Sequence, residues 1–131
     1  MKVYESEFMI INHLPESQTL ELIWKEETGN MVDWDFKATL YVYASFAIEY
    51  QVHNLLVHIH HFRFGGAMSD ELTTWRDKEV FPKYNEAGVL KFAFWGDASQ
   101  LPPQDPPKSP VANFDTRFFS ERADVDAWFE E

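Results

Sequence analysis

The feature that most constrains the fold is an apolar run, residues 55–62, that ends in histidines and leads through a glycine pair into the start of a helix. The run is rich in leucine, valine and isoleucine, which is typical of a buried strand. After Gly65 and Gly66, residues 69–71 (SDE) provide an N-cap and an acidic first turn. The order strand, glycine turn, helix predicts an α/β protein, and such sheets usually bind ligands beyond the carboxyl ends of their strands.

The composition predicts one ordered domain. A chain of 131 residues is within the usual range of a single domain and is long enough to bury a core. Hydrophobic residues make up 45% of the chain and aromatic residues 17%, and these side chains must be packed away from water. We therefore expect residues 1–131 to fold as a single domain with a proline-rich loop at about 97–113, where five prolines prevent helix or sheet hydrogen bonding.

The charge and the cysteine count restrict the partners and the chemistry. With 22 acidic against 11 basic residues the formal net charge is -11, so the surface should repel nucleic acids and anionic membranes. No apolar stretch is long enough to cross a bilayer, and the acidic amino-terminal residues lack the apolar core of a secretion signal, so we expect a cytoplasmic protein. The absence of cysteine excludes disulfides, thiol nucleophiles and thiolate zinc sites.

Hydrophobic periodicity and turn residues predict the order β-β-α-β-α-β-β-α. This order requires a single mixed sheet of about five strands flanked by three helices, with right-handed crossovers where a helix joins parallel strands. Pro82 should kink or break the second helix. The predicted strands are residues 8–13, 19–24, 54–61, 89–95 and 114–119, and the predicted helices are residues 34–51, 69–88 and a short one after Ser120.

The longest predicted helix, residues 34–51, has two apolar stripes at helical spacing. We expect the first stripe to face the sheet, and the second to lie under a neighbouring helix or in the interface of a homodimer. The first stripe contains Trp34, Ala38, Tyr41, Val42, Ser45, Ile48 and Val52, and the candidate interface contains Phe36, Leu40, Tyr43, Ala47 and Tyr50.

Four stretches of the chain resemble the STAS-like family of small bacterial proteins, also called SpoIIAA-like, which is related to the anti-sigma-factor antagonists. They span most of the chain and contain core positions rather than a catalytic signature. They are residues 20–31 (LELIWKEETGNM), residues 55–57 (LLV) leading to 62–64 (FRF), residues 80–83 (VFPK), and residues 114–119 (FDTRFF) followed by the helix that contains Trp128.

The resemblance implies a mixed sheet flanked by helices, a regulatory role through protein contacts or small-ligand sensing, and no cofactor. Relatives in the wider group accept a phosphate on a serine or threonine at the start of the helix after the central strand. Ser69 is the candidate phosphosite in this sequence. Asp70 and Glu71 would repel an added phosphate, whereas the helix dipole would favour it.

The histidines at the end of the central strand are candidate metal ligands. His58 and His60 should project from one face of the strand and His61 from the other. Two imidazoles would form half of a metal site, which Asp97 or Asp115 could complete. Histidines at the end of a strand, however, are more often hydrogen-bonded to the backbone or to water. We therefore expect no bound metal.

Arg63, Gly65 and Gly66 are candidates for an anion pocket, because exposed amides and a cation near a helix start attract negative charge. Paired glycines, however, more often serve a tight connection. Together with His58 and His60, these residues form the candidate ligand pocket.

The sequence contains no complete catalytic constellation, since neither Ser45 nor Ser69 has the glycine neighbours of a nucleophile elbow. We expect a non-enzymatic regulatory or protein-interaction module that acts as a homodimer. The high aromatic content leaves an alternative, a carrier or sensor of a small apolar ligand with its pocket near the carboxyl ends of the strands.

Overall fold

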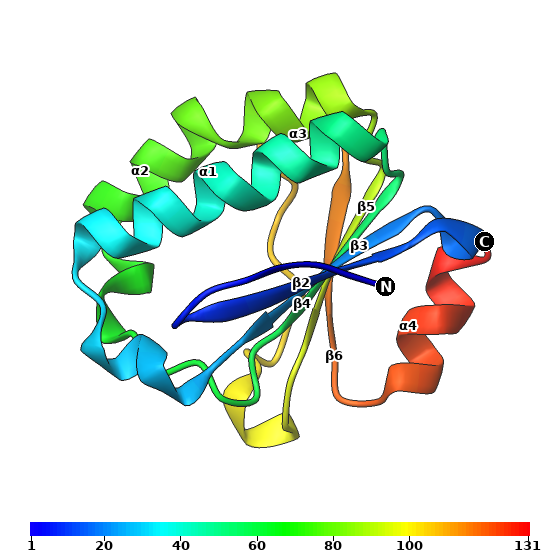
Figure 1. Ribbon diagram of the computed structural model, residues 1–131. Coiled ribbons are helices and arrows are strands. Elements are labelled where there is room, and N and C mark those ends of the chain that lie inside the picture. The colour runs from blue at the N-terminus through cyan, green and yellow to red at the C-terminus, as the bar shows by residue number, and fades with distance from the viewer.

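The computed structural model describes all 131 residues of the chain except the side chains of Ala67 and Met68 (Figure 1). In this described part the chain forms one mixed sheet of six strands in the spatial order β1-β2-β3-β4-β5-β6. Strands β1 to β3 form an antiparallel meander, and β3 to β6 run parallel, so the prediction of an α/β protein with a mixed sheet is confirmed. The strands are β1 (Lys2–Glu5), β2 (Met9–Leu14), β3 (Thr19–Trp24), β4 (Asn54–His58), β5 (Lys91–Trp95) and β6 (Asp115–Phe119).

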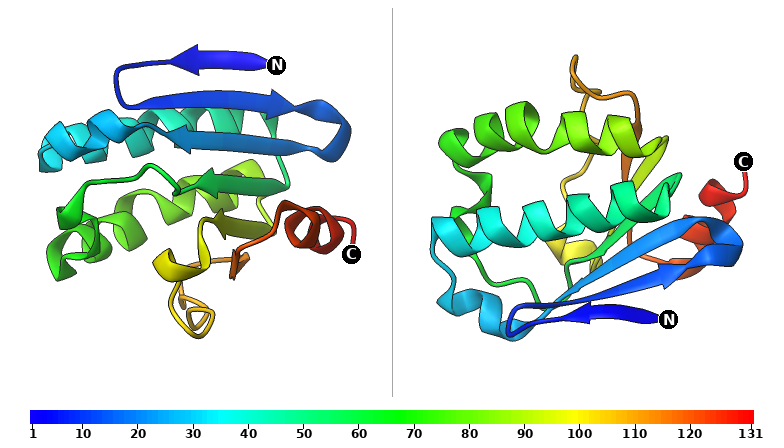
Figure 2. Two further views of the ribbon diagram at one scale, coloured as in Figure 1. Left: turned by 90° about the horizontal axis from the view of Figure 1, so that it is seen from below. Right: turned by 45° about the horizontal axis from the view of Figure 1, so that its top comes forward.

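Helices lie on both faces of this sheet. The structure places α1 (Asp33–Tyr50), α2 (Asp70–Glu79) and α3 (Phe81–Ala87) on one face and α4 (Arg122–Phe129) on the other (Figures 1 and 2). α1 packs against α3, and α4 packs against β5 and β6. The hydrophobic core is divided accordingly, with a large cluster on the α1 side and a small one under α4. The buried residues of the small cluster are Leu56, Ala93, Val125 and Trp128.

The sheet has one strand more than the sequence predicts, because the chain begins with a short edge strand. β1 pairs antiparallel with β2. Its four residues (KVYE) are too few to show a clear periodicity, and the Lys2 ammonium lies 2.6 Å from the Glu5 carboxylate. Short, charged edge strands limit unwanted pairing with the sheets of other chains. The observed order is therefore β-β-β-α-β-α-α-β-β-α.

The second predicted helix is divided into α2 and α3. The break falls at Val80, and Pro82, which has no N–H to donate to a preceding turn, lies in the first turn of α3. Gly88, with a φ of +96°, ends α3 in the left-handed region that favours glycine. The predicted effect of Pro82 is confirmed.

Helix α1 is turned so that most of the candidate interface is buried in the core. Phe36, Leu40, Tyr43 and Ala47, which were candidates for an interface between subunits, are at most 8% exposed and belong to the core of their own chain. The Tyr43 hydroxyl donates a hydrogen bond of 2.7 Å to the carbonyl oxygen of Leu20 on β3. Of the two alternatives for this stripe, packing within the chain is confirmed, since α1 packs against α3 and the rings of Tyr43 and Tyr84 are 6.2 Å apart, and the interface between subunits is contradicted.

Only part of the other stripe of α1, which was predicted to face the sheet, turns outward, since Val52 is buried and Val42 and Ile48 are half-buried against the core. Trp34 is 74% exposed and Tyr41 is 38% exposed. Tyr50, the fifth residue of the candidate interface, is half-buried and stacks on His13 with ring centroids 4.1 Å apart. Both stripes have helical spacing and similar apolar content, so the sequence pattern by itself could not show which of them is buried. Small side chains such as Ala44 on the buried side let α1 approach its neighbours closely.

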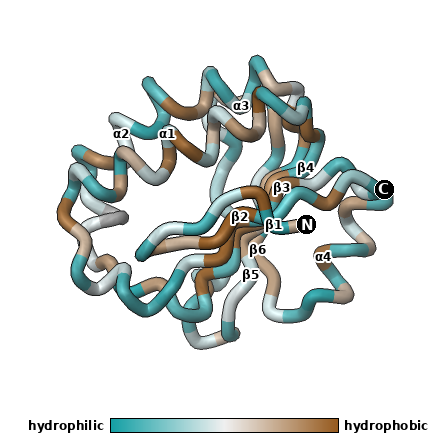
Figure 3. Tube along the Cα trace, viewed as in Figure 1, coloured by the Kyte–Doolittle hydropathy of each residue, from teal (hydrophilic) through white to brown (hydrophobic). Residues whose placement is uncertain are grey.

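The proline-rich loop closes the core beside α3. Ala112 and Phe114 at its end are buried. Asn85 of α3 holds this segment, since its amide donates to the carbonyl oxygen of Val111 at 2.7 Å and accepts the N–H of Asn113 at 2.8 Å. Figure 3 shows the resulting distribution along the chain, with hydrophobic residues gathered on the central strands and hydrophilic residues on the outer turns of the helices.

The orientation of α1 can be tested by stability measurements. Replacing Leu40 by Ala should lower the free energy of unfolding by about 2–5 kcal/mol, because it leaves a cavity in the core. Replacing Ser45 by Ala, on the exposed side of the same helix, should change it by less than about 0.5 kcal/mol. Urea unfolding followed by circular dichroism measures both values, and a Leu40→Ala variant as stable as the parent protein would contradict this orientation.

Candidate functional site

Glu21, a carboxylate in the middle of β3, is the buried ionisable residue that marks the candidate site. Side chains of β3 alternate between the faces of the sheet, and Leu20 and Leu22 belong to the core on the α1 side. Glu21 therefore points to the face that carries α4, where it is 6% exposed. A buried charge destabilises a protein unless it is paired and hydrogen-bonded.

Three side chains from three other elements converge on the Glu21 carboxylate. Nε2 of His58 on β4 lies 2.7 Å from Oε2, and Nη1 of Arg122 at the start of α4 donates to the same oxygen at 3.2 Å. Asn12, directly opposite Glu21 in the β2–β3 pair, donates from Nδ2 to Oε1 at 2.9 Å. Both carboxylate oxygens therefore have partners, and the cluster joins β2, β3, β4 and α4.

These contacts set the ionisation of Glu21. Burial by itself would raise the pKa, because it removes water from the charged form. The hydrogen bonds from His58 and Asn12 and the electrostatic effect of His58 and Arg122 act in the opposite direction, and together they lower the pKa of Glu21 from 4.5 to about 2. Glu21 is therefore ionised at neutral pH.

Trp95 on β5 extends the cluster towards the carboxyl ends of the strands. Its ring meets His58 and His60 edge to face, with centroid distances of 4.7 Å and 4.8 Å. The rings of His58 and His60 are 6.2 Å apart, but β4 ends at His58 and His60 lies in the turn that follows, so alternation along a strand does not account for their proximity. His61 lies elsewhere, with Nδ1 3.5 Å from the carboxylate of Glu26.

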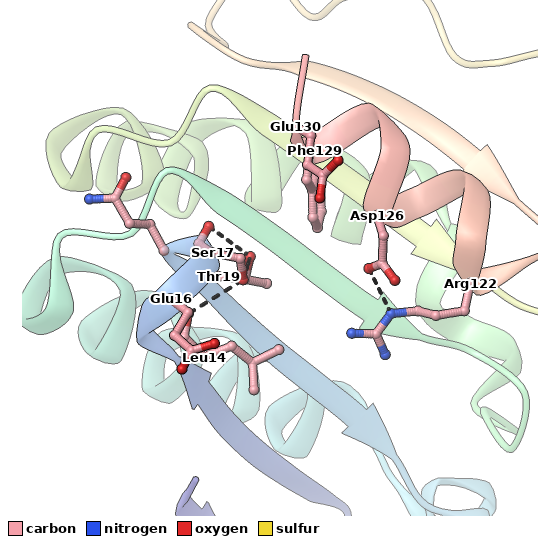
Figure 4. Close-up of a pocket in the computed structure, with 9 residues that line it drawn as sticks. Leu14, Glu16, Ser17, Thr19, Arg122, Asp126, Phe129 and Glu130 are labelled. Carbon is pink, nitrogen blue, oxygen red and sulfur yellow. Dashed lines mark hydrogen bonds and ion pairs between the residues drawn. The ribbon is translucent and has the colours of Figure 1, made fainter.

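A cleft of about 480 Å³ opens beside this cluster, between the turn that joins β2 to β3 and helix α4 (Figure 4). Arg122 lies at one end of it, and its Nε donates to Asp126 at 3.1 Å. Figure 4 shows that Arg122, Asp126 and Phe129 lie on the side of α4 that faces the turn. The cleft is lined by Leu14, Glu16, Ser17, Gln18, Thr19, Arg122, Asp126, Phe129 and Glu130.

A second candidate surface lies on the other face of the molecule, where α1, α2 and α3 meet. It consists of Trp34, Lys37, Tyr41, Trp75 and Lys83, and we term it the aromatic surface. The rings of Tyr41 and Trp75 pack edge to face with centroids 5.3 Å apart. Nζ of Lys37 lies 5.5 Å from the ring centre of Trp75, and Nζ of Lys83 lies 6.0 Å from that of Tyr41. Ammonium groups at these distances attract the faces of aromatic rings.

The five residues of the predicted ligand pocket fall into two groups. His58 and His60 lie against Trp95 as described above, whereas the guanidinium of Arg63 donates to two carbonyl oxygens of its own turn, each at 3.2 Å. Gly65 and Gly66 lie in a short 3-10 turn, and a Cβ on Gly66 would come 2.9 Å from a phenylalanine ring. None of the five lines the cleft beside α4 or a smaller cleft between α1 and the β1–β2 hairpin.

Ser69, the candidate phosphosite, is the N-cap of α2. Its Oγ accepts the backbone N–H of Leu72 at 3.2 Å, which satisfies one of the free donors of the first turn. The acidic residues Asp70 and Glu71 follow it in that turn, as the sequence indicated. Phosphorylation of Ser69 stays a prediction.

The histidines do not assemble with the carboxylates that were considered as further metal ligands. Within the part of the chain that the structure describes, no group of three or more histidine and carboxylate side chains lies close enough to hold a metal ion. Asp115 instead lies 3.6 Å from the ammonium of Lys108, and the backbone N–H of Asp97 is hydrogen-bonded to Gln100.

Sequence reasoning missed the Glu21 cluster, although one half of the signal was present. Glu21 interrupts an otherwise apolar strand (TLELIW), and such a charge is rarely buried without a partner. The partner could not be found from the pattern, because Arg122 is 101 residues away along the chain.

Comparison of the chain with models of protein families, with curated proteins and with solved structures found no match. The resemblance to the STAS-like family therefore stays a prediction. Among the described residues, no helix is both long enough and apolar enough to cross a membrane.

The Glu21 cluster predicts a specific dependence of stability on pH. Because the pKa of Glu21 is depressed in the folded chain, its stabilisation is complete above the ordinary pKa of 4.5 and is lost as the pH falls towards 2. The full effect is about 3 kcal/mol, of which about 2 kcal/mol should be lost by pH 3.

Urea unfolding of the parent protein and of a Glu21→Gln variant between pH 3 and pH 7 measures this effect. The stability advantage of the parent should shrink as the pH falls. A Glu49→Gln variant, which removes an exposed carboxylate of α1, is the control and should follow the parent closely. An advantage that does not change with pH would show that the low pKa of Glu21 is wrong.

Proposed function

We propose that this protein is a non-enzymatic interaction module that forms a homodimer through the aromatic surface. The observation that carries the proposal is Trp34, which is 74% exposed on the outward side of α1. Large aromatic side chains that lie in water in the free chain are frequent hot spots of protein interfaces. The proposal keeps the role expected from the sequence and moves the interface to the opposite stripe of the same helix.

The arrangement of the aromatic surface supports binding to another protein. The rings of Tyr41 and Trp75 pack edge to face in the free chain. Because these side chains are already restrained, they would lose less conformational entropy on binding a partner than free side chains would. Lys37 and Lys83 add positive charge beside these rings on a chain with a net charge of -11. In this dimer the lysines are held over aromatic rings of their own chain, which attract their positive charge.

The outward side of α1 is also suited to two-fold packing. α1 has 18 residues and is therefore about 27 Å long. Ala38 lies between Trp34 and Tyr41 on the outward stripe, and its small side chain would let two copies of the helix approach closely. In an antiparallel pair centred between Lys37 and Ala38, each Trp34 would meet Tyr41 of the second copy, as the symmetry of a two-fold dimer requires.

The histidine cluster differs from a hydrolytic dyad. His58 is held by the carboxylate of Glu21, and no serine or threonine hydroxyl is among the hydrogen-bond partners found for it in the described residues. A hydrolytic dyad would need such a hydroxyl beside the imidazole.

The alternative of an apolar-ligand carrier has less support. The larger cleft lies beside Thr19, at the amino end of the parallel strand β3, whereas the sequence placed the ligand pocket at the carboxyl ends. It is lined by three carboxylates and one guanidinium, which an apolar ligand would have to desolvate.

The dimer can be tested by sedimentation velocity over a range of protein concentrations. Replacing Trp34 by Ala should weaken dimerisation by roughly 30-fold, which corresponds to the loss of about 2 kcal/mol at an interface hot spot. Leu90→Ala is the matched control, because Leu90 is 57% exposed but precedes β5, away from the aromatic surface. This control should dimerise like the parent protein.

Two results would contradict the proposal. A parent protein that stays monomeric at about 100 µM would exclude a stable homodimer, since specific dimers of moderate affinity assemble well below this concentration. A dimer that is weakened equally by Trp34→Ala and by Leu90→Ala would place the interface elsewhere.

A further inference from the structure

The cleft between the β2–β3 turn and α4 lies on the opposite face of the sheet from the aromatic surface (Figures 1 and 4). Its volume of about 480 Å³ is within the usual range of small-molecule sites, about 300–1,000 Å³. One wall belongs to the turn and the other to α4, so the cleft is formed by two segments that are far apart in the sequence. A site here would be independent of the proposed dimer.

Both walls of the cleft offer apolar surface. Leu14, the last residue of β2, lines one wall, and Phe129 of α4 lines the other. Both side chains are half-buried, so each leaves part of its apolar surface open. A short hydrocarbon chain placed between them would be covered from two sides.

The polar lining of the cleft is acidic on both walls. Glu16 lies on the turn and Glu130 follows α4, and both are exposed. No ion pair to either carboxylate is found among the residues that the structure describes. These two carboxylates can therefore accept hydrogen bonds from a ligand without first releasing another cation.

The positive charge of Arg122 is already neutralised. Its Nη1 donates to Glu21 at 3.2 Å and its Nε donates to Asp126 at 3.1 Å. The lining thus has three carboxylates against one guanidinium, and the chain as a whole is strongly acidic. An anionic ligand would be repelled, whereas a cation would be attracted.

We propose that this cleft binds a small aliphatic cation with an amino group near each end, such as a linear diamine. The hydrocarbon chain would lie between Leu14 and Phe129, and the ammonium groups would bind Glu16 on one wall and Glu130 on the other. The two apolar residues account for the aliphatic part of the ligand, and carboxylates on opposite walls account for the two amino groups.

The test uses 1,5-diaminopentane as the probe, with calorimetric titration of the full chain at 150 mM salt. Replacing Glu16 and Glu130 together by Gln should weaken binding about tenfold, because two exposed ion pairs are lost. The Glu49→Gln, Glu86→Gln double variant removes the same charge from exposed positions outside the cleft and should bind within about twofold of the parent. In heteronuclear NMR spectra, the probe should shift amide signals of residues 14–19 and 122–130.

Three results would overturn the proposal. Equal weakening by the two double variants would show that the diamine senses only the net charge of the chain. Equal binding of 1,5-pentanediol, which has the same length without charge, would exclude recognition by the carboxylates. Tighter binding of the dicarboxylate glutarate would show that the cleft selects anions. None of these results affects the dimer, which is tested at Trp34.

Discussion

The ionised carboxylate of Glu21 is the interaction on which the α4 side of the sheet depends. It lies on a central strand and is held by side chains from β2, β4 and α4, and the contact with Arg122 ties the start of α4 to β3. α4 is also supported by the small cluster that contains Val125 and Trp128, and by Lys91 of β5, which donates to the carbonyl oxygen of Trp128 at 2.7 Å. Because a buried carboxylate is tolerated only when it is fully paired, this one residue constrains the position of the helix and of the cleft beside it.

The two faces of the sheet therefore present different surfaces. On one face α1, α2 and α3 cover the strands. Trp34 and Tyr41 of α1 are exposed to solvent on this side. On the other face the short helix α4 covers part of the sheet, and its edge forms a cleft with acidic walls. The proposed homodimer uses the first surface and the proposed cation site uses the second, so the two proposals depend on separate residues.

Much of the local structure could be predicted from the sequence. The apolar runs located β2 to β6, five prolines explained the long loop, and Pro82 explained the division between α2 and α3. The short strand β1 was missed because four residues carry almost no periodicity. The buried side of α1 was predicted wrongly because both of its stripes are apolar, and a hydrophobic pattern cannot distinguish two surfaces of similar composition.

The sequence by itself determined that the chain alternates strands and helices, because periodicity and turn chemistry are local properties. It did not determine how His58 and His60 approach each other, because β4 ends at His58 and His60 lies in the turn that follows. Only the tertiary structure decided which stripe of α1 is buried and which cation reaches Glu21. Both depend on contacts between residues far apart in the chain, such as Glu21 and Arg122, and no local pattern records them.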